Sequence, residues 1–258
     1  MRSLRLVRAG LALTLLVVAA CETAPLTGRS QLIIVPEQQE LAMGLQAYQD
    51  VLKKSRLSRD AAASEQVSRV GLRIAAATGR TDYRWEFHLI EDKQVNAFCL
   101  PGGKVAVYTG ILPVTRDDAG LAAVLGHEVS HAIARHGAER MSQGLLVETG
   151  LAATQVALAR NDPGMVRNVT ALLGAGASVG LLLPWSRTQE SEADHLGLIY
   201  MAKAGYPPSA ARDLWVRMKA MSGGQRQPEF LSTHPAPETR IQQIEAWMPE
   251  AMRYYTPR

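Results

Sequence analysis

The sequence predicts an α+β protein in which helices predominate, and three observations lead to that prediction. The chain has 258 residues, of which 47% are hydrophobic and 5% are aromatic, enough for one substantial globular domain. Apolar residues recur every three to four positions along most of the chain, which is the period of an amphipathic helix. The period changes to two only between residues 83 and 112, which predicts one small antiparallel sheet.

Residues 1–20 have the pattern of a signal peptide. Three arginines precede an apolar run that is too short for a stable membrane span. The residues before Cys21, Val-Ala-Ala, resemble the bacterial lipobox, so we expect Cys21 to be acylated and to become the mature N-terminus. Under the sorting rule of enterobacterial lipoproteins, Glu22 at the next position implies the outer membrane. An ordinary secretory peptide cleaved near Ala20 is the alternative.

The rest of the chain is predicted as a lipidated, extended tether over residues 21–35 and a single domain over residues 36–258. Without the signal peptide the basic and acidic residues nearly balance, and the basic ones form no stripe, which argues against a nucleic-acid partner. Cys99 is the other cysteine, so lipidation of Cys21 leaves no intramolecular disulfide. Cys99 is expected to be a small buried apolar residue, and a catalytic thiol is the alternative.

Two amphipathic helices are predicted before the sheet. The first covers residues 36–54 with Pro36 at its start, and the second covers residues 59–77 and ends at Gly79. In the sheet, His88 alternates onto the polar side of its strand. We therefore expect a surface or hydrogen-bonding histidine there, with metal binding as the alternative.

The strongest chemical signal is an H-E-x-x-H motif, with His127, Glu128 and His131 inside a continuous helix predicted over residues 123–135 and capped by Thr115. Helical residues four apart differ by only about 40° around the axis, so both histidines could hold one metal ion. In zinc peptidases with this motif the imidazoles are ligands and the carboxylate is the general base for the metal-bound water. The pattern also arises by chance, but imidazoles on an otherwise apolar face need a partner.

A catalytic zinc needs a third protein ligand, and a second predicted helix offers two candidates. Glu190 and Asp194 are four residues apart and share a face, whereas Glu192 points away from them. Either of the first two could bind the metal while the other orients an imidazole. A solvated acidic face that pairs with Arg187 is the alternative.

Four stretches together resemble the zinc metallopeptidase family that contains the HtpX heat-shock protease and the CAAX-prenyl endopeptidases, a gluzincin family. They are residues 96–103 (NAFCLPGG), 127–137, 190–194 (ESEAD) and 232–235 (STHP) followed by Arg240. The likeness is strongest to the periplasmic lipoprotein branch of the BepA and LoiP type. It implies a zincin-like metallopeptidase domain and one Zn2+ per chain. A metzincin would need a histidine at the position of Gly137 and is excluded.

The resemblance also implies a role for each site residue. Glu190 would be the third zinc ligand, and Asp194 the carboxylate that supports His127. His234 would stabilise the oxyanion or, in a resting form, occupy the place of the water, and an unrelated loop histidine is the alternative. His136 matches too, but nine residues after His127 it would lie on the opposite helical face, so we expect a structural role.

In families of this kind the strand next to the zinc helix pairs with the substrate backbone. This implies that residues 104–109 bind substrate through Val105 and Val107, with Asn96 and Gly103 shaping the approach. Gly103 and its glycine neighbour also predict a turn that needs a permissive backbone.

Residues 144–184 are rich in alanine, glycine and leucine. We expect a helical pair or mobile cover over the active-site helix, with membrane insertion as the alternative. Arg240 is expected to anchor the loop of His234 through an acidic partner or to form a surface salt bridge.

The predicted function is a zinc-dependent endopeptidase of the bacterial envelope, in which zinc and Glu128 activate the water. The resemblance alone implies its substrates, misfolded or misassembled outer-membrane proteins. The competing hypothesis is a chaperone-like outer-membrane assembly lipoprotein with weak or gated proteolysis. The expected partners are unfolded envelope polypeptides, the outer-membrane assembly machinery and, through Cys21, the periplasmic face of the outer membrane.

Overall fold

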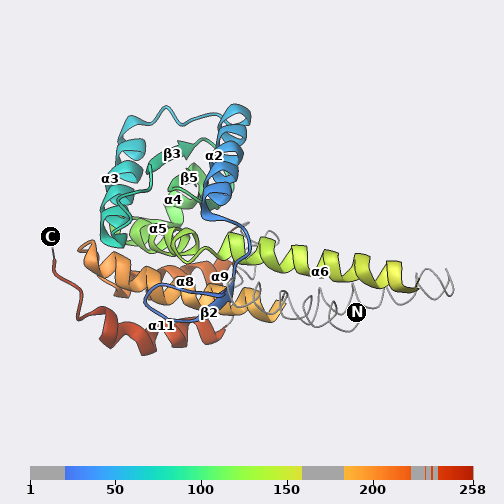
Figure 1. The fold of residues 1–258 in the computed structure, drawn as a ribbon. Coiled ribbons are helices and arrows are strands. Elements are labelled where there is room, and N and C mark those ends of the chain that lie inside the picture. The colour runs from blue at the N-terminus through green and yellow to red at the C-terminus, as the bar shows by residue number, and fades with distance from the viewer. Residues whose placement is uncertain (1–20, 159–182, 222–229, 231–233, 235–237, 258) are drawn as a thin grey trace. The chain divides into compact units, whose positions relative to one another are not determined.

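The computed structural model describes residues 21–158, 183–221, 230, 234 and 238–257 (Figure 1). The chain divides into two units, of which the smaller comprises Met1–Gln39 with Arg135–Arg187 and the larger comprises Glu40–Ala134 with Thr188–Arg258. Residues 36–258, which were predicted as one domain, contribute to both units.

The larger unit begins with the two helices that the sequence predicts, α2 (Glu37–Lys54) and α3 (Ala61–Thr78). Asp60 caps α3 by accepting a hydrogen bond from the Ala63 N–H, and Gly79 ends it with a φ of +74°. The other helical elements are η1 (Thr109–Ile111), α4 (Leu112–Thr115), α5 (Asp118–Ile133), most of α8 (Leu183–Lys203), α9 (Ser209–Met221) and α11 (Glu238–Ala251). The predicted α+β class with predominant helix is confirmed.

The sheet of the larger unit has three strands, β3 (Glu86–Ile90), β4 (Ala97–Leu100) and β5 (Lys104–Tyr108), in the order β3-β5-β4. The central strand β5 pairs antiparallel with β4 but parallel with β3. The sheet is therefore mixed, and the prediction of a wholly antiparallel sheet is wrong. The cause is the position of β4, which follows β3 in the chain but pairs on the far side of β5.

The two outer strands of this sheet differ in how their edges are used. On the outer side of β3, Leu57 forms an antiparallel bridge with Ile90, and Ser58 N–H donates to Leu89 O over 2.8 Å. Among the described residues, β4 has a ladder with β5 alone. The edge of β4 is thus the one at which another extended chain could be added.

Helix α5 is the buried centre of the larger unit, where it contacts α3, β4 and α9. Asp117, not the predicted Thr115, is its N-cap and accepts a 2.8 Å hydrogen bond from Gly120 N–H. The helix ends at Ile133, so the prediction of one helix over residues 123–135 is wrong at its end. Arg135 has a φ of +56°, which right-handed helix does not allow.

In the smaller unit, β1 (Cys21–Thr23) and β2 (Ser30–Leu32) form an antiparallel hairpin, followed by a segment that packs on α6 (His136–Leu158). Ile33 and Val35 bury apolar surface against Ala138, with Met141 beside them. The stretch predicted as an extended tether is therefore folded.

Ion pairs hold this hairpin. Arg29 donates two hydrogen bonds to the buried carboxylate of Glu139, over 2.7 and 2.9 Å. Arg135 does the same for Glu22, over 2.7 and 2.6 Å, and also donates to Val35 O. Two three-residue strands form too short a ladder to be stable alone. The side chains of Arg29 and Arg135 supply the additional hydrogen bonds that hold the hairpin in place.

The expectations for residues 1–20 and for most of residues 144–184 lie outside the described residues, except that α6 extends to Leu158. His136 is 1% exposed and begins α6, so it does not share a helix with His127. In the part of the chain that the structure describes, no helix combines the length and apolar character that crossing a bilayer requires.

Candidate metal centre

Helix α5 supplies two imidazoles that meet on one face. His127 and His131 are one turn apart, and their Nε2 atoms are 3.1 Å from each other. His127 is 2% exposed, because the residues around it from Leu121 to Ser130 are buried in the core. Two Nε2 atoms converging in a buried site are suited to sharing one metal ion.

Helix α8 brings a carboxylate to the same point. Glu190 is 6% exposed, and its Oε1 lies 3.3 Å from His131 Nε2 while its Oε2 lies 3.4 Å from His127 Nε2. Burial raises the pKa of Glu190, but hydrogen bonds from the surrounding imidazoles outweigh it and hold the pKa far below its ordinary value. Glu190 is thus ionised, as a metal-ligating carboxylate must be.

His234 contributes a fourth donor. Its Nδ1 is 3.1 Å from His127 Nε2 and 3.0 Å from both carboxylate oxygens of Glu190. One ligand atom from each of His127, His131, Glu190 and His234 lies within 4.8 Å of the others. Three imidazoles and one carboxylate are nitrogen and oxygen donors of the kind that zinc prefers, so the residues fit this metal.

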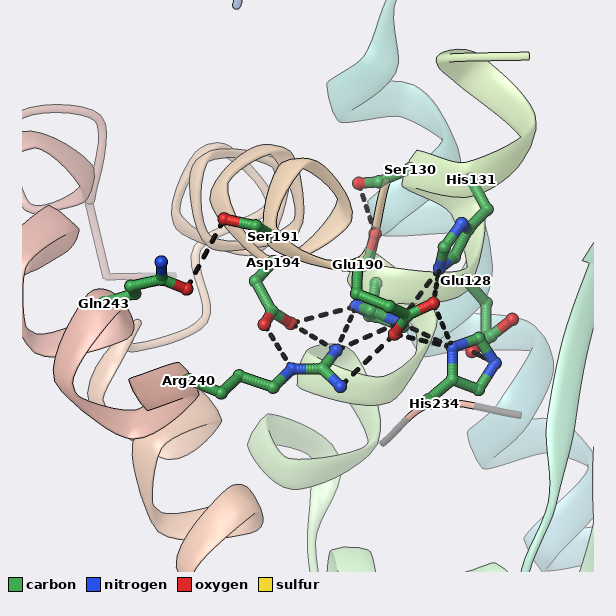
Figure 2. A network of polar contacts seen from close by, with 11 residues as sticks. Glu128, Ser130, His131, Glu190, Ser191, Asp194, His234, Arg240 and Gln243 are labelled. Atoms are coloured by element: carbon green, nitrogen blue, oxygen red, sulfur yellow. Dashed lines mark hydrogen bonds and ion pairs between the residues drawn. The ribbon is translucent and has the colours of Figure 1, made fainter. Parts of the chain in front are cut away.

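Asp194 and Arg240 support the imidazole of His127, and Figure 2 shows these two side chains in contact with each other. Asp194 Oδ1 lies 3.0 Å from His127 Nδ1, which leaves His127 Nε2 directed at the other donors. Burial raises the pKa of Asp194, but the Arg240 guanidinium and the bond with His127 hold it below its ordinary value. The partner of Arg240 is acidic, as expected, because its guanidinium donates to Asp194. Arg240 is only 2% exposed, which rules out the alternative of a surface salt bridge.

Glu128 lies beside the four donors but is not one of them. It is 3% exposed, and its Oε1 has no hydrogen-bond partner among the described residues, although His234 Nε2 is 3.4 Å away. Burial, with a smaller contribution from Glu190, raises the pKa of Glu128 to about 7, against the opposing effects of His234 and Arg240. A carboxylate that exchanges its proton near neutral pH, with one oxygen open to a water, is suited to general-base catalysis.

Two aromatic residues near His127 were missed by the sequence analysis. The ring centroids of Trp215 and Phe230 lie 5.9 and 6.1 Å from that of His127. Trp215 belongs to α9, and its only sequence signal was a place in the apolar stripe of an amphipathic helix. That signal is the same for any core residue, so it could not identify the contact.

The predicted substrate-binding strand does not match the structure. Val105 and Val107 are fully buried in β5, whose two edges are occupied by β3 and β4. A peptide cannot pair with a strand that has no open edge, so these two assignments are wrong. The glycine prediction is confirmed, because Gly103 has a φ of +79° and a Cβ there would stand 2.7 Å from the Trp85 ring. Asn96 precedes β4, and its Oδ1 accepts from Ala97 N–H.

His88 and Cys99, the two remaining candidates, do not belong to the set of four donors. His88 Nδ1 hydrogen-bonds Tyr48 OH over 2.7 Å, and the hydroxyl donates in turn to Val105 O. His88 is therefore a hydrogen-bonding histidine, as expected. Burial, with a smaller contribution from Glu128, raises the pKa of the Cys99 thiol well above its ordinary value, which disfavours a catalytic thiolate.

Residues 61–248 match the sequence profile described as Peptidase family M48. The chain is 40% identical over 236 residues to mitochondrial metalloendopeptidase OMA1 of Schizosaccharomyces pombe, a match that covers 89% of this chain and 67% of that one. It is 29% identical over 247 residues to metalloendopeptidase OMA1, mitochondrial, of Homo sapiens, covering 90% and 47%. It is 27% identical over 228 residues to the beta-barrel assembly-enhancing protease of Escherichia coli, covering 86% and 46%. The chain thus spans about half the length of the human and bacterial relatives.

Proposed function

The chain belongs to peptidase family M48 and is a zinc metalloendopeptidase, and we propose that it acts in the bacterial envelope on misfolded or misassembled outer-membrane proteins. The observation that carries the chemistry is the buried set of four donors with the unbonded Oε1 of Glu128 beside it. The family predicted by resemblance is confirmed. Its periplasmic lipoprotein branch stays a prediction, since the relatives include mitochondrial proteins as well as bacterial ones.

Each residue of the metal centre has a distinct role in the reaction. His127, His131 and Glu190 would hold the zinc, which when bound acts as a Lewis acid toward water and the peptide carbonyl. Glu128 takes the proton of the attacking water on its unbonded Oε1 and passes it to the leaving amine. The carboxylate of Asp194 keeps the Nδ1 proton of His127 in place, so that Nε2 stays available as a ligand.

The substrate would pair with β4, because no other strand lies along its outer edge among the described residues. Tyr108 N–H donates to Asn96 O across the ladder, so alternation sends the carbonyl oxygens of Ala97 and Cys99 to the open side, while Ala97 N–H is held by Asn96 Oδ1. The Cys99 N–H interacts with the Glu128 carboxylate, which places this edge at the general base. At the start of the edge, Phe230 N–H donates a 3.0 Å hydrogen bond to Val95 O, so this carbonyl is not available to a substrate. An extended peptide added from Ala97 onward would therefore pass Glu128.

The envelope location draws support from the sequence and from one relative. Cys21 follows a lipobox-like sequence after a signal-peptide pattern, which favours a lipid anchor in the periplasmic leaflet of the outer membrane. The Escherichia coli relative is named for enhancing β-barrel assembly, which favours outer-membrane proteins as substrates. A Cys21→Ser variant should move from the membrane fraction to the soluble periplasmic fraction, and unchanged fractionation would contradict the anchor.

A second candidate is an assembly lipoprotein whose proteolysis is gated, and the position of His234 favours it. One ligand atom of His234 lies within 4.8 Å of those of His127, His131 and Glu190, so His234 would hold the zinc as a fourth ligand where a catalytic site keeps a water. Hydrolysis would then require His234 to leave.

The deciding experiment compares wild type, Glu128→Gln and the exposed control Glu148→Gln, all loaded with zinc, on an unfolded outer-membrane β-barrel protein. We expect cleavage by wild type and Glu148→Gln and none by Glu128→Gln. Equal cleavage by all three would contradict the assignment of Glu128. If Glu128→Gln restores outer-membrane integrity in cells that lack the protein, the assembly function is favoured over proteolysis.

A further inference from the structure

A buried arginine joins the two carboxylates of the metal centre. Arg240 lies in the first turn of α11, and its Nη2 donates to Asp194 Oδ1 over 2.8 Å while its Nε donates to Asp194 Oδ2. Its Nη1 lies 3.3 Å from Glu190 Oε2. Figure 2 shows the guanidinium between these two side chains. One planar group thus contacts both the residue that supports a zinc ligand and a zinc ligand itself.

The guanidinium lies against an aromatic face. Arg240 Cζ is 3.5 Å from the ring centroid of Trp215, a cation–π contact, and Trp215 is 3% exposed on α9. The same indole meets the ring of His127 at an interplanar angle of 75°. Because the ring packs in the core, it fixes the plane of the guanidinium, and that plane decides where the N–H groups point.

Carboxylates need such a constraint from outside. The terminal torsions of Asp and Glu have broad minima, so neither Asp194 nor Glu190 fixes the plane of its own carboxylate. For Asp194 that plane determines whether Oδ1 faces His127 Nδ1, and for Glu190 it determines which oxygen faces the metal.

We propose that Arg240, held in its plane by Trp215, is a positioning residue that fixes both carboxylates in the orientation that zinc binding requires. The inference rests on the zinc site assigned above. It does not give Arg240 a contact with the metal or with the reacting atoms.

The contacts require arginine and not only a positive charge. Two parallel N–H groups bind Asp194, a third N–H reaches Glu190, and the flat face lies on Trp215. A lysine ammonium at this position could satisfy one carboxylate as a point charge but has no fork and no flat face. Arg240→Lys therefore keeps the charge and removes the positioning.

The test measures zinc affinity by competition with a chromogenic chelator, together with the visible spectrum of the cobalt-substituted protein. For Arg240→Lys we expect zinc affinity to fall by about 10- to 100-fold, the range for partners that support metal ligands, and the cobalt bands to broaden and weaken. Trp215→Leu should act in the same direction. Trp215→Phe, which retains an aromatic face, should recover most of the affinity.

The matched control is Arg212→Gln, which removes an exposed ion pair with Glu245 between the same two helices, α9 and α11. It should leave affinity and spectrum unchanged. Wild-type affinity and an unchanged cobalt spectrum in Arg240→Lys would overturn the proposal, and so would a lower melting temperature of the zinc-free variant with unchanged affinity, since that pattern means a structural role. If wild type takes up no zinc, the metal centre itself is wrong and the inference falls with it.

Discussion

Gly126 of α5 and Gly197 of α8 pack backbone against backbone, so closely that a Cβ on Gly126 would stand 2.9 Å from Gly197 O. A Cβ on Gly197 would likewise stand 2.9 Å from His127 N. No real Cβ is accommodated at such a distance without movement of the backbone. This contact sets the separation of the two helices that carry His127 and Glu190.

We therefore expect Gly197→Ala to separate the helices and to weaken zinc binding about tenfold or more, in the range for residues that support metal ligands. The matched control is Gly144→Ala on α6, where a Cβ meets nothing within 4 Å. That change should raise stability slightly, by about 0.5–1 kcal/mol, because alanine favours helix. Chelator competition measures the first effect and thermal unfolding the second. Equal zinc affinity in both variants would contradict the role of the glycine contact.

Glu128→Gln should stabilise the zinc-free protein in a pH-dependent way. Burial raises the pKa of Glu128 to about 7, so the folded state binds its proton more tightly than the unfolded state does. The stability that this proton contributes is complete below the ordinary pKa, is lost as pH rises toward 7, and is absent above that. Glutamine has no proton to lose.

The variant should therefore match wild type at acidic pH and exceed it above pH 7 by up to about 3 kcal/mol, at about 1.4 kcal/mol per pKa unit. Urea unfolding from pH 4 to 8 after zinc removal measures this difference. Glu148→Gln, an exposed change on α6, should give a curve parallel to wild type. A constant difference between Glu128→Gln and wild type across the range would mean that the Glu128 pKa is ordinary.

His234→Ala should open the centre. If His234 fills the fourth zinc position at rest, its removal leaves His127, His131 and Glu190 with one position for water, so zinc is retained and hydrolysis of an unstructured peptide rises several-fold. Zinc content and peptide turnover are the measurements. A fall in kcat with zinc retained would instead show that His234 stabilises the oxyanion.

Methylation of peptide nitrogens should reveal the pairing with β4. In an antiparallel strand pair alternate N–H groups face the partner, so methylating a substrate at every second nitrogen removes either the bonds to β4 or none of them. One methylated series should lose about 1 kcal/mol of binding per position, seen as a higher KM. The series shifted by one residue is the control. Equal KM in the two series would argue against docking on the β4 edge.

The chemistry of this protein could be predicted because it depends on local spacing. A four-residue interval puts His127 with His131 and Glu190 with Asp194 on single helical faces, and the structure places all four together. The order of contacts within the set, with Glu190 at the two Nε2 atoms and Asp194 at Nδ1, was open from spacing alone. The family resemblance implied it.

What escaped prediction depends on contacts between distant residues. Alternation shows that a segment is a strand but not which strand it joins, so the parallel pairing of β3 with β5 and the closed edges of β5 were missed. The break at Arg135 depends on a positive φ in a residue that rarely adopts one. The hairpin of β1 and β2 depends on ion pairs such as Arg29 with Glu139, 110 residues later in the chain. Neither a positive φ nor an ion pair between distant residues leaves a periodic signal in the sequence.

The outer edge of β4, along which the described residues place no other strand, has a consequence for which proteins are cut. An edge of this kind reads main-chain hydrogen-bonding groups, which a native protein keeps paired within its own secondary structure. A client can offer them only where a segment has opened, so its susceptibility should follow the free energy of that local opening more than the side chains at the scissile bond. Ranking one client's variants by amide hydrogen exchange should then also rank their cleavage.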